Sequence, residues 1–539
     1  MSSEDYVLRP ESSGRYRRLN REVGEKQLLR TDLAPGRSAL PGRRIARFAQ
    51  LTDFQLADPY SPGRLTFLHR LAGRAGWEFM FPAYRPQEPL LLQAIEATVR
   101  TLRAAGDLDF VVTTGDSIDS AQANELAALL ALLDGDAEVD PNFGVRDPKG
   151  HPAQSVSAEF YNPEPDSRDV YKLEHGFPDI PGLLAAAGKP FAAAGLGIPW
   201  LGCFGNHDCL VQGRALPTDA LQDLVTGDRQ PIELGIEPPD RPMEVYLADP
   251  TALSQGPSQP LEPRADRRVI TPAEYVRAHL DSPTQPPGHG FSAANLADGT
   301  AYYCYDAVPG LRLIVLDSTH PAGHVTGSIG ARQRDWLIDR LTEVHSSYLG
   351  VAGSEVTTGN PDRVVVLASH HAPTMMNNTT PGPRDAERRY HAADIEEIAH
   401  RFGNVVLWVA GHEHRNSVVA HPGPGGGFWH LITSGLCEWP CQTRALEIAL
   451  PQSDSDDDLL IIRSTMLDHD APARPGAALD LWDLASCHRE LAVNEPSRVG
   501  GPQSAGTPAD RNVDLLVPIR PALAATLRAL SDAARAAVS

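Results

Sequence analysis

Several short apolar runs in this chain end directly in residues that carry chemistry. Runs of mainly apolar residues over 45–51, 109–114, 198–204, 363–368 and 405–410 have the length and character of buried strands. The polar residues that follow them are Asp53, Asp116, Asn206 with His207 and Asp208, His370 with His371, and His412 with His414. Ligands of layered α/β folds gather outside the carboxyl ends of strands. The recurrence therefore predicts one site built from five strand ends.

Helical spacing alternates with these strands. Residues 89–105 place Leu91, Ile95, Val99 and Leu102 on one face, and helices are also predicted over 124–133, 333–344 and 394–402. Additional strands are predicted over 311–316, 428–433, 444–449 and 459–464. Strand and helix in alternation indicate a layered α/β fold, and the closely spaced late strands favour antiparallel pairing in a mixed sheet or two sheets.

Two long stretches, 134–190 and 211–290, lose this periodicity and accumulate proline and glycine. They are predicted to be surface insertions, and the second, which follows directly on a strand-end cluster, is interpreted as a possible lid. Residues 1–43 are polar and are predicted to form an arm, 44–470 the main domain, and 471–539 a Pro/Ala-rich extension with an amphipathic segment over 521–538.

The charge balance narrows the range of partners. Among 539 residues, 48 Lys and Arg face 69 Asp and Glu, a formal charge of −21, which repels nucleic acid. An anionic substrate would need local positive charge from metal ions or arginines. The chain has no apolar segment near the roughly 20 residues of a membrane span and no signal-peptide core, so a cytoplasmic protein is predicted.

Carboxylate, amide and imidazole side chains together are typical ligands of Zn, Mn and Fe, and they are too rich in nitrogen for a Ca or Mg cage. The segment Gly205-Asn-His-Asp208 is the most specific of the clusters. In Gly411-His-Glu-His414 the two imidazoles alternate, so they point the same way from an extended segment, although a solvated loop is also compatible. Gly115-Asp116 alone also suits a simple turn. In combination, the clusters predict a metal site.

In this order, the clusters resemble the motifs of the calcineurin-like metallophosphoesterase family. That family has Asp-x-His, Gly-Asp-x-x-Asp, Gly-Asn-His-Asp/Glu, a strand-end His and Gly-His-x-His. The corresponding segments here are Asp53-Phe-Gln55, Gly115-Asp-Ser-Ile-Asp119, Gly205-Asn-His-Asp208, Ser369-His-His371 and Gly411-His-Glu-His414. The resemblance covers about residues 45–470 and implies an α/β/β/α sandwich with two mixed sheets and large insertions.

The resemblance also implies two metal ions, Mn, Fe or Zn, and a small phosphate ester, either a monoester or a diester, as substrate. It divides the ligands into two sets that share Asp116: Asp53, Asp116 and His414 for the first ion, and Asp116, Asn206, His370 and His412 for the second. A hydroxide that bridges the ions would attack phosphorus.

Within this scheme His207 would donate a proton to the leaving oxygen, and Asp208 would orient the His207 ring. The alternative for His207 is a loop imidazole that is hydrogen-bonded only for structure. Asp119 is interpreted as a structural hydrogen-bonding partner rather than a ligand.

One position departs from the family pattern. Gln55 stands where the first motif has histidine, and its neutral amide oxygen is a weaker ligand for a borderline metal. The consequence is a weaker first site, a preference for a harder metal such as Mn, or no first metal; a weaker or Mn-leaning site is expected because the other ligands remain. The alternative function is a catalytically weak metal-binding or regulatory protein that retains the fold.

Three further residues are candidates for substrate contact. His371 follows the expected ligand His370 and would lie behind it or meet the substrate. Arg415 follows the Gly-His-x-His segment and would meet phosphate oxygens, unless its loop is simply solvated. His289, at the end of the lid-like stretch, would lie over the site, the alternative being an ordinary loop residue.

Overall fold

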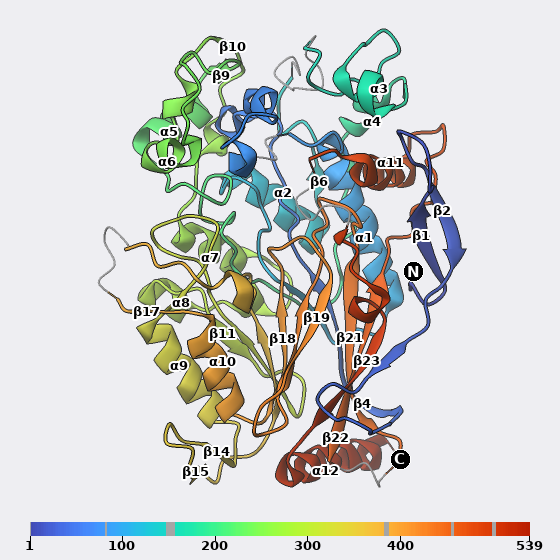
Figure 1. Cartoon of the computed structure of the whole chain (residues 1–539), viewed down its shortest axis with the longest axis vertical. Helices are drawn as coiled ribbons and strands as arrows, with labels where there is room; N and C mark the ends of the chain where they lie inside the picture. Colours follow the sequence, from blue (N-terminus) through green and yellow to red (C-terminus); the bar gives the residue numbers. More distant parts are fainter. Residues whose placement is uncertain are drawn as a thin grey trace.

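Two β-sheets packed face to face form the centre of the protein (Figure 1). The computed structural model describes residues 2–80, 84–146, 157–381, 387–453, 458–497 and 503–538. Part of the predicted first insertion (147–156) and of the predicted C-terminal extension (498–502 and 539) lies outside the described residues.

The seven-stranded sheet has the order β3-β23-β22-β21-β4-β5-β8. Its strands are β3 (Leu28–Arg30), β4 (Pro41–Leu51), β5 (Phe110–Thr113), β8 (Trp200–Leu201), β21 (Thr443–Pro451), β22 (Leu459–Leu467) and β23 (Val513–Pro518). Strands β4, β5 and β8 run parallel, whereas β21 pairs antiparallel with both β4 and β22. The sheet is therefore mixed.

The six-stranded sheet has the order β11-β12-β16-β18-β20-β19. Its strands are β11 (Tyr303–Tyr305), β12 (Leu311–Val315), β16 (Val364–Ala368), β18 (Val405–Ala410), β19 (Ser417–His421) and β20 (Phe428–Ile432). The four inner strands are parallel, and the edge strands β11 and β19 are antiparallel to their neighbours. This sheet is mixed as well.

Strands β16 and β18 consist of apolar residues throughout, because both of their faces are buried. In β16, Val364, Val366 and Ala368 belong to the core between the sheets. The alternate residues Val365 and Leu367 pack instead into a second core beneath the helices on the outer face. A strand with one face in water would show alternating polar residues at those positions.

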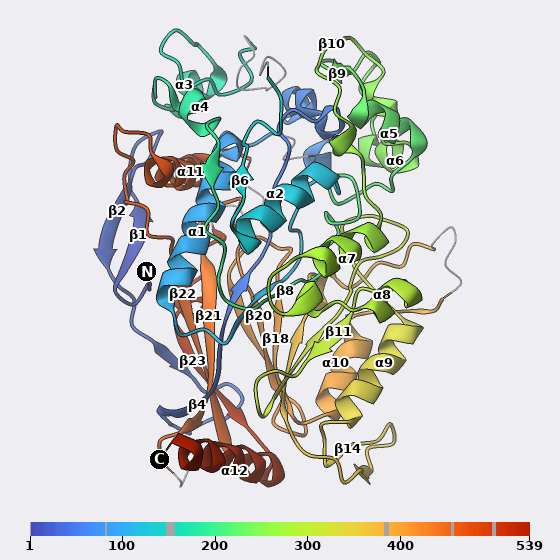
Figure 2. The ribbon, with the colours of Figure 1, turned by 180° about the vertical axis from the view of Figure 1, so that it is seen from behind.

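Helices cover the outer face of each sheet (Figures 1 and 2). On the six-stranded sheet these are α9 (Ala331–Thr342) and α10 (Ala392–Arg401), whose apolar residues join the second core. On the seven-stranded sheet α1 (Leu91–Ala105) and α2 (Ala123–Asp134) join the main core, and α11 (Leu481–Asn494) packs on α1. The predicted α/β/β/α sandwich with two mixed sheets is confirmed.

The two insertions form short elements at the end of the sandwich where the inner strands finish (Figure 1). The first contains β6 (Glu138–Val139), α3 (Val170–His175) and α4 (Leu183–Ala187), and β7 (Phe191–Ala192) follows directly after it and pairs with β6. The second contains α5 (Asp219–Thr226), β9 (Arg229–Pro231), α6 (Pro242–Ala248), β10 (Ser258–Pro260) and α7 (Pro272–Asp281). Helices of ten residues or fewer show little periodicity in sequence, which explains why these stretches look irregular. Helix α7 nevertheless has a clear start signal, a capping box between Thr271 and Glu274 with Pro272 at its first position.

Smaller elements complete the fold. They are the paired strands β1 (Tyr6–Pro10) and β2 (Leu19–Val23), helix α8 (Ala293–Asp298), strands β13 (Ile329–Gly330) and β17 (Arg389–Tyr390), strands β14 (Ser347–Leu349) and β15 (Glu355–Thr357), and helix α12 (Pro521–Val538).

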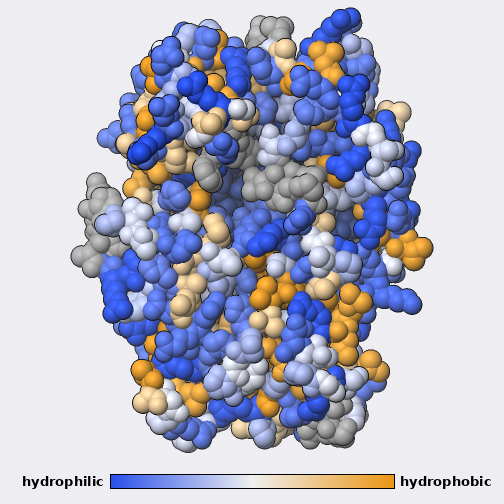
Figure 3. All heavy atoms as spheres, viewed as in Figure 1, coloured by the Kyte–Doolittle hydropathy of each residue, from blue (hydrophilic) through white to orange (hydrophobic). Residues whose placement is uncertain are grey.

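Segments from both ends of the chain contribute to the seven-stranded sheet, because β3 pairs in parallel with β23. The division into an arm, one domain and an extension stays a prediction. Hydrophilic side chains cover most of the face shown in Figure 3. None of the described helices combines the length and apolar character needed to cross a membrane.

Candidate metal centre

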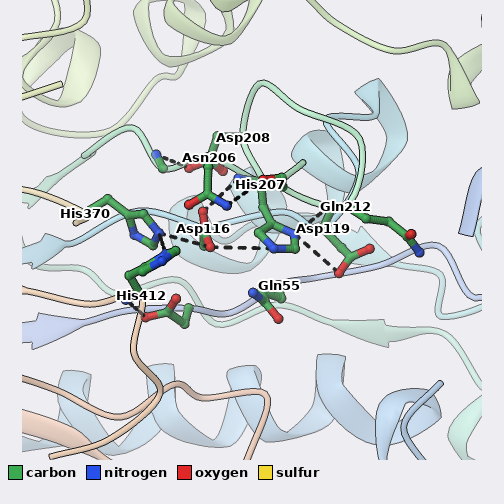
Figure 4. Close-up of polar contacts among 12 residues, drawn as sticks. Gln55, Asp116, Asp119, Asn206, His207, Asp208, Gln212, His370 and His412 are labelled. Atoms are coloured by element: carbon green, nitrogen blue, oxygen red, sulfur yellow. Dashed lines mark hydrogen bonds and ion pairs between the residues drawn. The ribbon is translucent and has the colours of Figure 1, made fainter. Parts of the chain in front are cut away.

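The five predicted strand ends meet at one edge of the sandwich. Strands β4, β5 and β8 of one sheet and β16 and β18 of the other all finish there. Figure 4 shows Asp116 in the middle of the group, with His370 and His412 on one side and His207 on the other. The structure therefore brings together side chains that are up to 361 positions apart in sequence, from Asp53 to His414.

The backbone at these strand ends adopts an uncommon conformation. Asp53, Gln55, Asp116, His412 and His414 all have positive φ, at 48°, 41°, 51°, 72° and 50°. Residues with a side chain rarely adopt this left-handed region, and such strain concentrates at functional sites. The sharp turn after each strand directs the side chain toward the shared edge of the two sheets.

Gly205 shows why the segment 205–208 begins with glycine. A Cβ atom at this position would lie 2.3 Å from the backbone nitrogen and from Oδ1 of Asp116. Only glycine allows the loop after β8 to approach the loop after β5 this closely.

His370 is fixed so that one ring nitrogen faces the other candidate ligands. Its Nδ1 lies 2.8 Å from the carbonyl oxygen of Thr114, which places the proton on Nδ1. Its Nε2 lies 3.1 Å from Asp116 Oδ2 and 3.1 Å from Nδ1 of His412. Although burial opposes protonation, Asp116 raises the pKa of His370 to about 9, and burial together with the neighbouring His370 lowers that of His412 to about 3.

His414 is held on both sides by carboxylates. Its Nε2 lies 3.2 Å from Asp53 Oδ1, and its Nδ1 lies 3.2 Å from Oε2 of Glu438. Burial opposes protonation, but Glu438 and Asp53 raise the pKa of His414 to about 10. A carboxylate behind a ligand histidine fixes its tautomer and its orientation. Glu438 has this position behind His414.

The side-chain oxygen of Asn206 shows whether these residues suit a metal ion. Asn206 donates from Nδ2 to the carbonyl oxygen of Gly213 at 2.9 Å, which fixes the amide. Its Oδ1 is buried and accepts no hydrogen bond from the described residues. Since a buried oxygen without a donor is costly, a cation is a fitting partner for it. His370, His412 and Asp116 complete a donor set typical of Mn, Fe or Zn.

Unlike the side-chain oxygen of Asn206, the side-chain oxygen of Gln55 is already occupied by a hydrogen bond. Its Oε1 accepts a hydrogen bond of 2.7 Å from Nη2 of Arg85, and the Sγ of Cys437 lies 3.6 Å from it. The Arg85 guanidinium also pairs with Glu438, at 2.9 Å. The first metal position therefore has Asp53, Asp116 and His414 as candidate ligands, with a buried cation beside them.

His207 is attached to the centre through its backbone and ring. Its backbone N–H donates to Asp116 Oδ1 at 2.8 Å, and its Nδ1 lies 2.8 Å from the carbonyl oxygen of Asp119. The Nε2 atom lies 3.9 Å from Asp116 Oδ2. Burial lowers the pKa of His207, against the opposing effect of Asp116 and Asp119. The ring thus keeps Nε2 free for a substrate.

The prediction that Asp208 orients the His207 ring is wrong. The Asp208 carboxylate accepts hydrogen bonds from the backbone N–H groups of Gly205, Ser117 and Ile118, at 2.7, 2.9 and 3.2 Å. It points away from the ring and ties the loop after β8 to the loop after β5. The ring is positioned by the carbonyl oxygen of Asp119 instead.

Asp119 serves as the structural partner that the sequence indicates. Its carboxylate accepts from Arg64 at 2.5 Å and from the hydroxyl of Ser120 at 2.9 Å. Arg64 is itself buried and also pairs with Glu88, at 2.5 Å. This buried network holds the carbonyl on which His207 rests.

The other sequence candidates are placed differently. His371 is buried, with Nδ1 2.8 Å from Ser318 Oγ and its ring centre 4.5 Å from that of His412. Arg415 pairs with Glu413 at 2.5 Å. The prediction that His289 lies over the site is wrong, because His289 is fully buried beside β8, where its ring stacks on Trp200 with centroids 3.5 Å apart.

A cavity of about 860 Å³ opens onto these residues. The side chains that line it include Gln55, Arg85, Asp116, Asp119, Asn206, His207, Gln212, Arg214, Met243, His324, Met375, His412, His414 and Arg415. Gln212, Arg214 and Met243 come from the predicted second insertion. Closure of this insertion as a lid stays a prediction. Sequence patterns did not indicate Arg85, Arg214 or Glu438, since all three lie in loops without periodicity.

Among known proteins, this chain is similar to solved structures but not to any family model or curated sequence. No protein-family model matches the chain, and no curated protein sequence matches it. A dimetal phosphatase from Danio rerio is 12% identical with a TM-score of 0.35, covering 79% of this chain and 100% of that one. The purple acid phosphatase PPD1 of yellow lupin is 10% identical with a TM-score of 0.30, covering 79% of this chain and 52% of that one.

The sulfate thiohydrolase SoxB of Thermus thermophilus is 13% identical with a TM-score of 0.29, covering 84% of this chain and 61% of that one. Sequence identities and TM-scores as low as these do not support a conclusion about function. The function is therefore inferred from the geometry of the site.

Proposed function

We propose that this chain is a metal-dependent phosphoesterase that hydrolyses a small phosphate monoester or diester, as the resemblance to calcineurin-like metallophosphoesterases implies. The observation that carries the proposal is the convergence of Asp116 with His370 and His412 around a fixed amide oxygen, that of Asn206, without a hydrogen-bond donor. Nitrogen and oxygen donors from both sheets surround this point. A structural turn would not need such a donor set.

The residues divide into two overlapping sets. Asp116, Asn206, His370 and His412 would hold one ion, and Asp53, Asp116 and His414 the other, of the type Mn, Fe or Zn. Two such ions, when bound, supply Lewis acidity and an activated water for attack on phosphorus. Asp116 suits the shared position because its two oxygens face different neighbours: Oδ1 accepts from the backbone of His207 and Oδ2 faces His370.

His207 would donate a proton from Nε2 to the leaving oxygen. Its Nδ1 is held by the carbonyl oxygen of Asp119, so the ring cannot turn away from the cavity without losing that hydrogen bond. Burial lowers the pKa of His207, which makes its charged form a stronger acid. The Asp119 carbonyl is thus a positioning group and His207 the catalytic residue.

The test is hydrolysis of aryl phosphates by the wild-type chain and by the variants Asp116→Asn and His412→Ala. Each variant is expected to lose both activity and bound metal, since each removes a ligand. Mono-aryl and bis-aryl phosphates distinguish a monoesterase from a diesterase. Full activity of either variant after treatment with a chelator would overturn the proposal.

A second function is favoured by one contact, that of Arg85 with Gln55. If the guanidinium prevents binding at the first position, the protein would bind one metal ion and act as a weak enzyme or a regulatory binding protein. Elemental analysis separates the two: two ions per chain support the phosphoesterase. One ion or none, without hydrolysis over a panel of phosphate esters, supports the binding protein.

A further inference from the structure

Arg214 is a cation of the cavity that the metal centre does not use. It lies in the loop that follows Gly205–Asp208, and its side chain lines the cavity together with His207 and Asp116. Its Nη1 donates to the carbonyl oxygen of Gln212 at 2.9 Å. Its Nε is buried without a hydrogen-bond partner, and no ion pair joins it to a carboxylate in the described part of the chain.

The neighbouring arginines are all neutralised. Arg85 pairs with Glu438 at 2.9 Å, Arg415 with Glu413 at 2.5 Å, and Arg64 behind the cavity with Asp119 at 2.5 Å. Arg214 is half-buried, and burial lowers its pKa although the more distant carboxylates of Asp119 and Asp116 oppose this effect. A partly buried cation that lacks a direct ion pair is costly. An anionic ligand in the cavity would supply the missing counter-charge.

The position of Arg214 is fixed by a tight turn. The N–H of Arg214 donates to the carbonyl of Val211 at 3.1 Å, and the two central residues, Gln212 and Gly213, have φ of 47° and 64°. Gln212 is anchored by a hydrogen bond of 2.6 Å from Nε2 to the carbonyl of Arg64. On the other side, the carbonyl of Arg214 accepts from the N–H of His324 at 2.8 Å.

The same turn packs on the proposed proton donor. A Cβ at position 213 would lie 2.2 Å from Cδ2 of His207, so only glycine fits there. Arg214 is the next residue. Both side chains line the cavity, and the charge of Arg214 contributes to the lowered pKa of His207, so the guanidinium lies in the part of the cavity near His207, where a leaving group would depart.

We propose that Arg214 forms an oxyanion-binding subsite for the leaving group, so that the preferred substrates are phosphoanhydrides, whose leaving group is itself a phosphate. This inference rests on the proposed phosphoesterase function. In hydrolysis, the oxygen of water bonds to phosphorus and the bond from phosphorus to the bridging oxygen breaks. The leaving oxygen keeps the electron pair and takes its proton from His207. The second phosphate stays bound to Arg214 by charge-assisted hydrogen bonds throughout.

The experiment compares two substrates that differ in the charge of the leaving group. Inorganic pyrophosphate and phenyl phosphate are assayed with the metal ion in excess, using wild-type protein, Arg214→Met and Arg214→Lys. Arg214→Met is expected to lower kcat/KM for pyrophosphate about 10- to 100-fold, the usual effect of losing a hydrogen bond to a charged group, and to change that for phenyl phosphate less than about threefold. Arg214→Lys keeps the charge and is expected to recover part of the difference.

The matched control is Arg241→Met, which removes an exposed arginine of the same insertion that pairs with Glu244. Circular dichroism and metal content show whether each variant is folded and loaded. Equal losses for both substrates in Arg214→Met, or no loss for either, would overturn the subsite while the phosphoesterase function stands. Hydrolysis of neither substrate by the metal-loaded wild-type protein would overturn both.

Discussion

The guanidinium of Arg85 donates a hydrogen bond of 2.7 Å to the side-chain oxygen of Gln55, at the position where the related motif has a metal-binding histidine. Arg85 is 4% exposed and is also paired with Glu438. A buried cation and an occupied amide oxygen make the first metal position poorer in ligands than the second. The two positions should therefore differ in affinity.

Restoring a histidine at position 55 is expected to strengthen the weaker site. Gln55→His adds an imidazole ligand next to Asp53, and the affinity of this position should increase by about 10- to 100-fold or more, the size of effect seen even for groups behind a ligand. Competition with a chelator, followed by elemental analysis, measures the change. Gln212→His, which also adds an imidazole to the cavity, serves as the control. Equal occupancy in Gln55→His and wild type would contradict the assignment.

Glu438 offers an independent test of the same position. Glu438→Gln keeps the size of the side chain but removes the carboxylate behind His414, and metal affinity is expected to fall about 10- to 100-fold. A metal titration followed by calorimetry reports the loss. Glu413→Gln, which removes a carboxylate paired with Arg415 in the neighbouring loop, should have a smaller effect. If the two variants behave alike, Glu438 does not support His414.

Replacement of His207 should separate catalysis from metal binding. His207→Asn removes the proposed proton donor but leaves its backbone hydrogen bond to Asp116 possible, so kcat is expected to fall about 10²- to 10⁴-fold while metal content stays unchanged. The loss should be smaller for a substrate with a good leaving group, such as an aryl ester with a strongly acidic phenol. A uniform loss over all leaving groups would argue for a structural role.

Asp208 should behave differently from its neighbour. Since its carboxylate accepts three backbone N–H groups, Asp208→Asn weakens the connection between two loops and is expected to lower the free energy of unfolding by about 1.5–3 kcal/mol. Thermal or chemical denaturation measures this effect. A variant of unchanged stability that lost only kcat would instead return Asp208 to the role of orienting His207.

A buried histidine far from the metal centre predicts acid sensitivity. His345 accepts from the N–H of Asn404 at 3.0 Å, which requires neutral Nε2, and burial lowers its pKa to about 4. The pKa of a histidine in the unfolded chain is about 6.5. At pH values between this and the folded pKa of His345, the unfolded chain therefore binds more protons than the folded one. The contribution to stability is therefore complete above pH 6.5 and declines as the pH falls toward 4.

For His345 alone the loss between pH 7 and pH 5 is about 2 kcal/mol. Urea denaturation at several pH values should show a steeper decline in the free energy of unfolding for wild type than for His345→Gln. Parallel curves for the two proteins would show that His345 titrates normally in the fold.

The sequence predicted the position of a site residue correctly where that residue directly follows a strand in the chain. The strand over 405–410 and the histidines that follow it are adjacent in the chain, so the apolar run itself locates His412 and His414 at the sheet edge. The same reasoning located Asp116 and Asn206. Periodicity over long helices was equally reliable, as the predicted segment 521–538 coincides with α12 (Pro521–Val538).

Sequence was uninformative where the outcome depends on the course of a loop. Asp208 is next to His207, but the turn directs the two side chains to opposite sides, so adjacency suggested the wrong role. Glu438 and Arg85 meet the site only because loops from distant parts of the chain fold back to it. His289 lies in a segment that follows the site in sequence, yet this segment packs alongside β8, where His289 contacts Trp200 and Gly202.

The parallel pairing of β3 with β23 bears on the order in which the chain can fold. Residues 28–30 pair with residues 513–515, so this edge strand has no partner in the sheet until residues 513–515 have been translated. Contacts of such long sequence separation form late, because the loop between them must first be closed. The six-stranded sheet, whose strands all lie between residues 303 and 432, can pair its strands earlier. The metal centre uses the ends of β4, β5 and β8 of one sheet and of β16 and β18 of the other. It can therefore assemble once residues up to His414 have been made, before β3 pairs with β23.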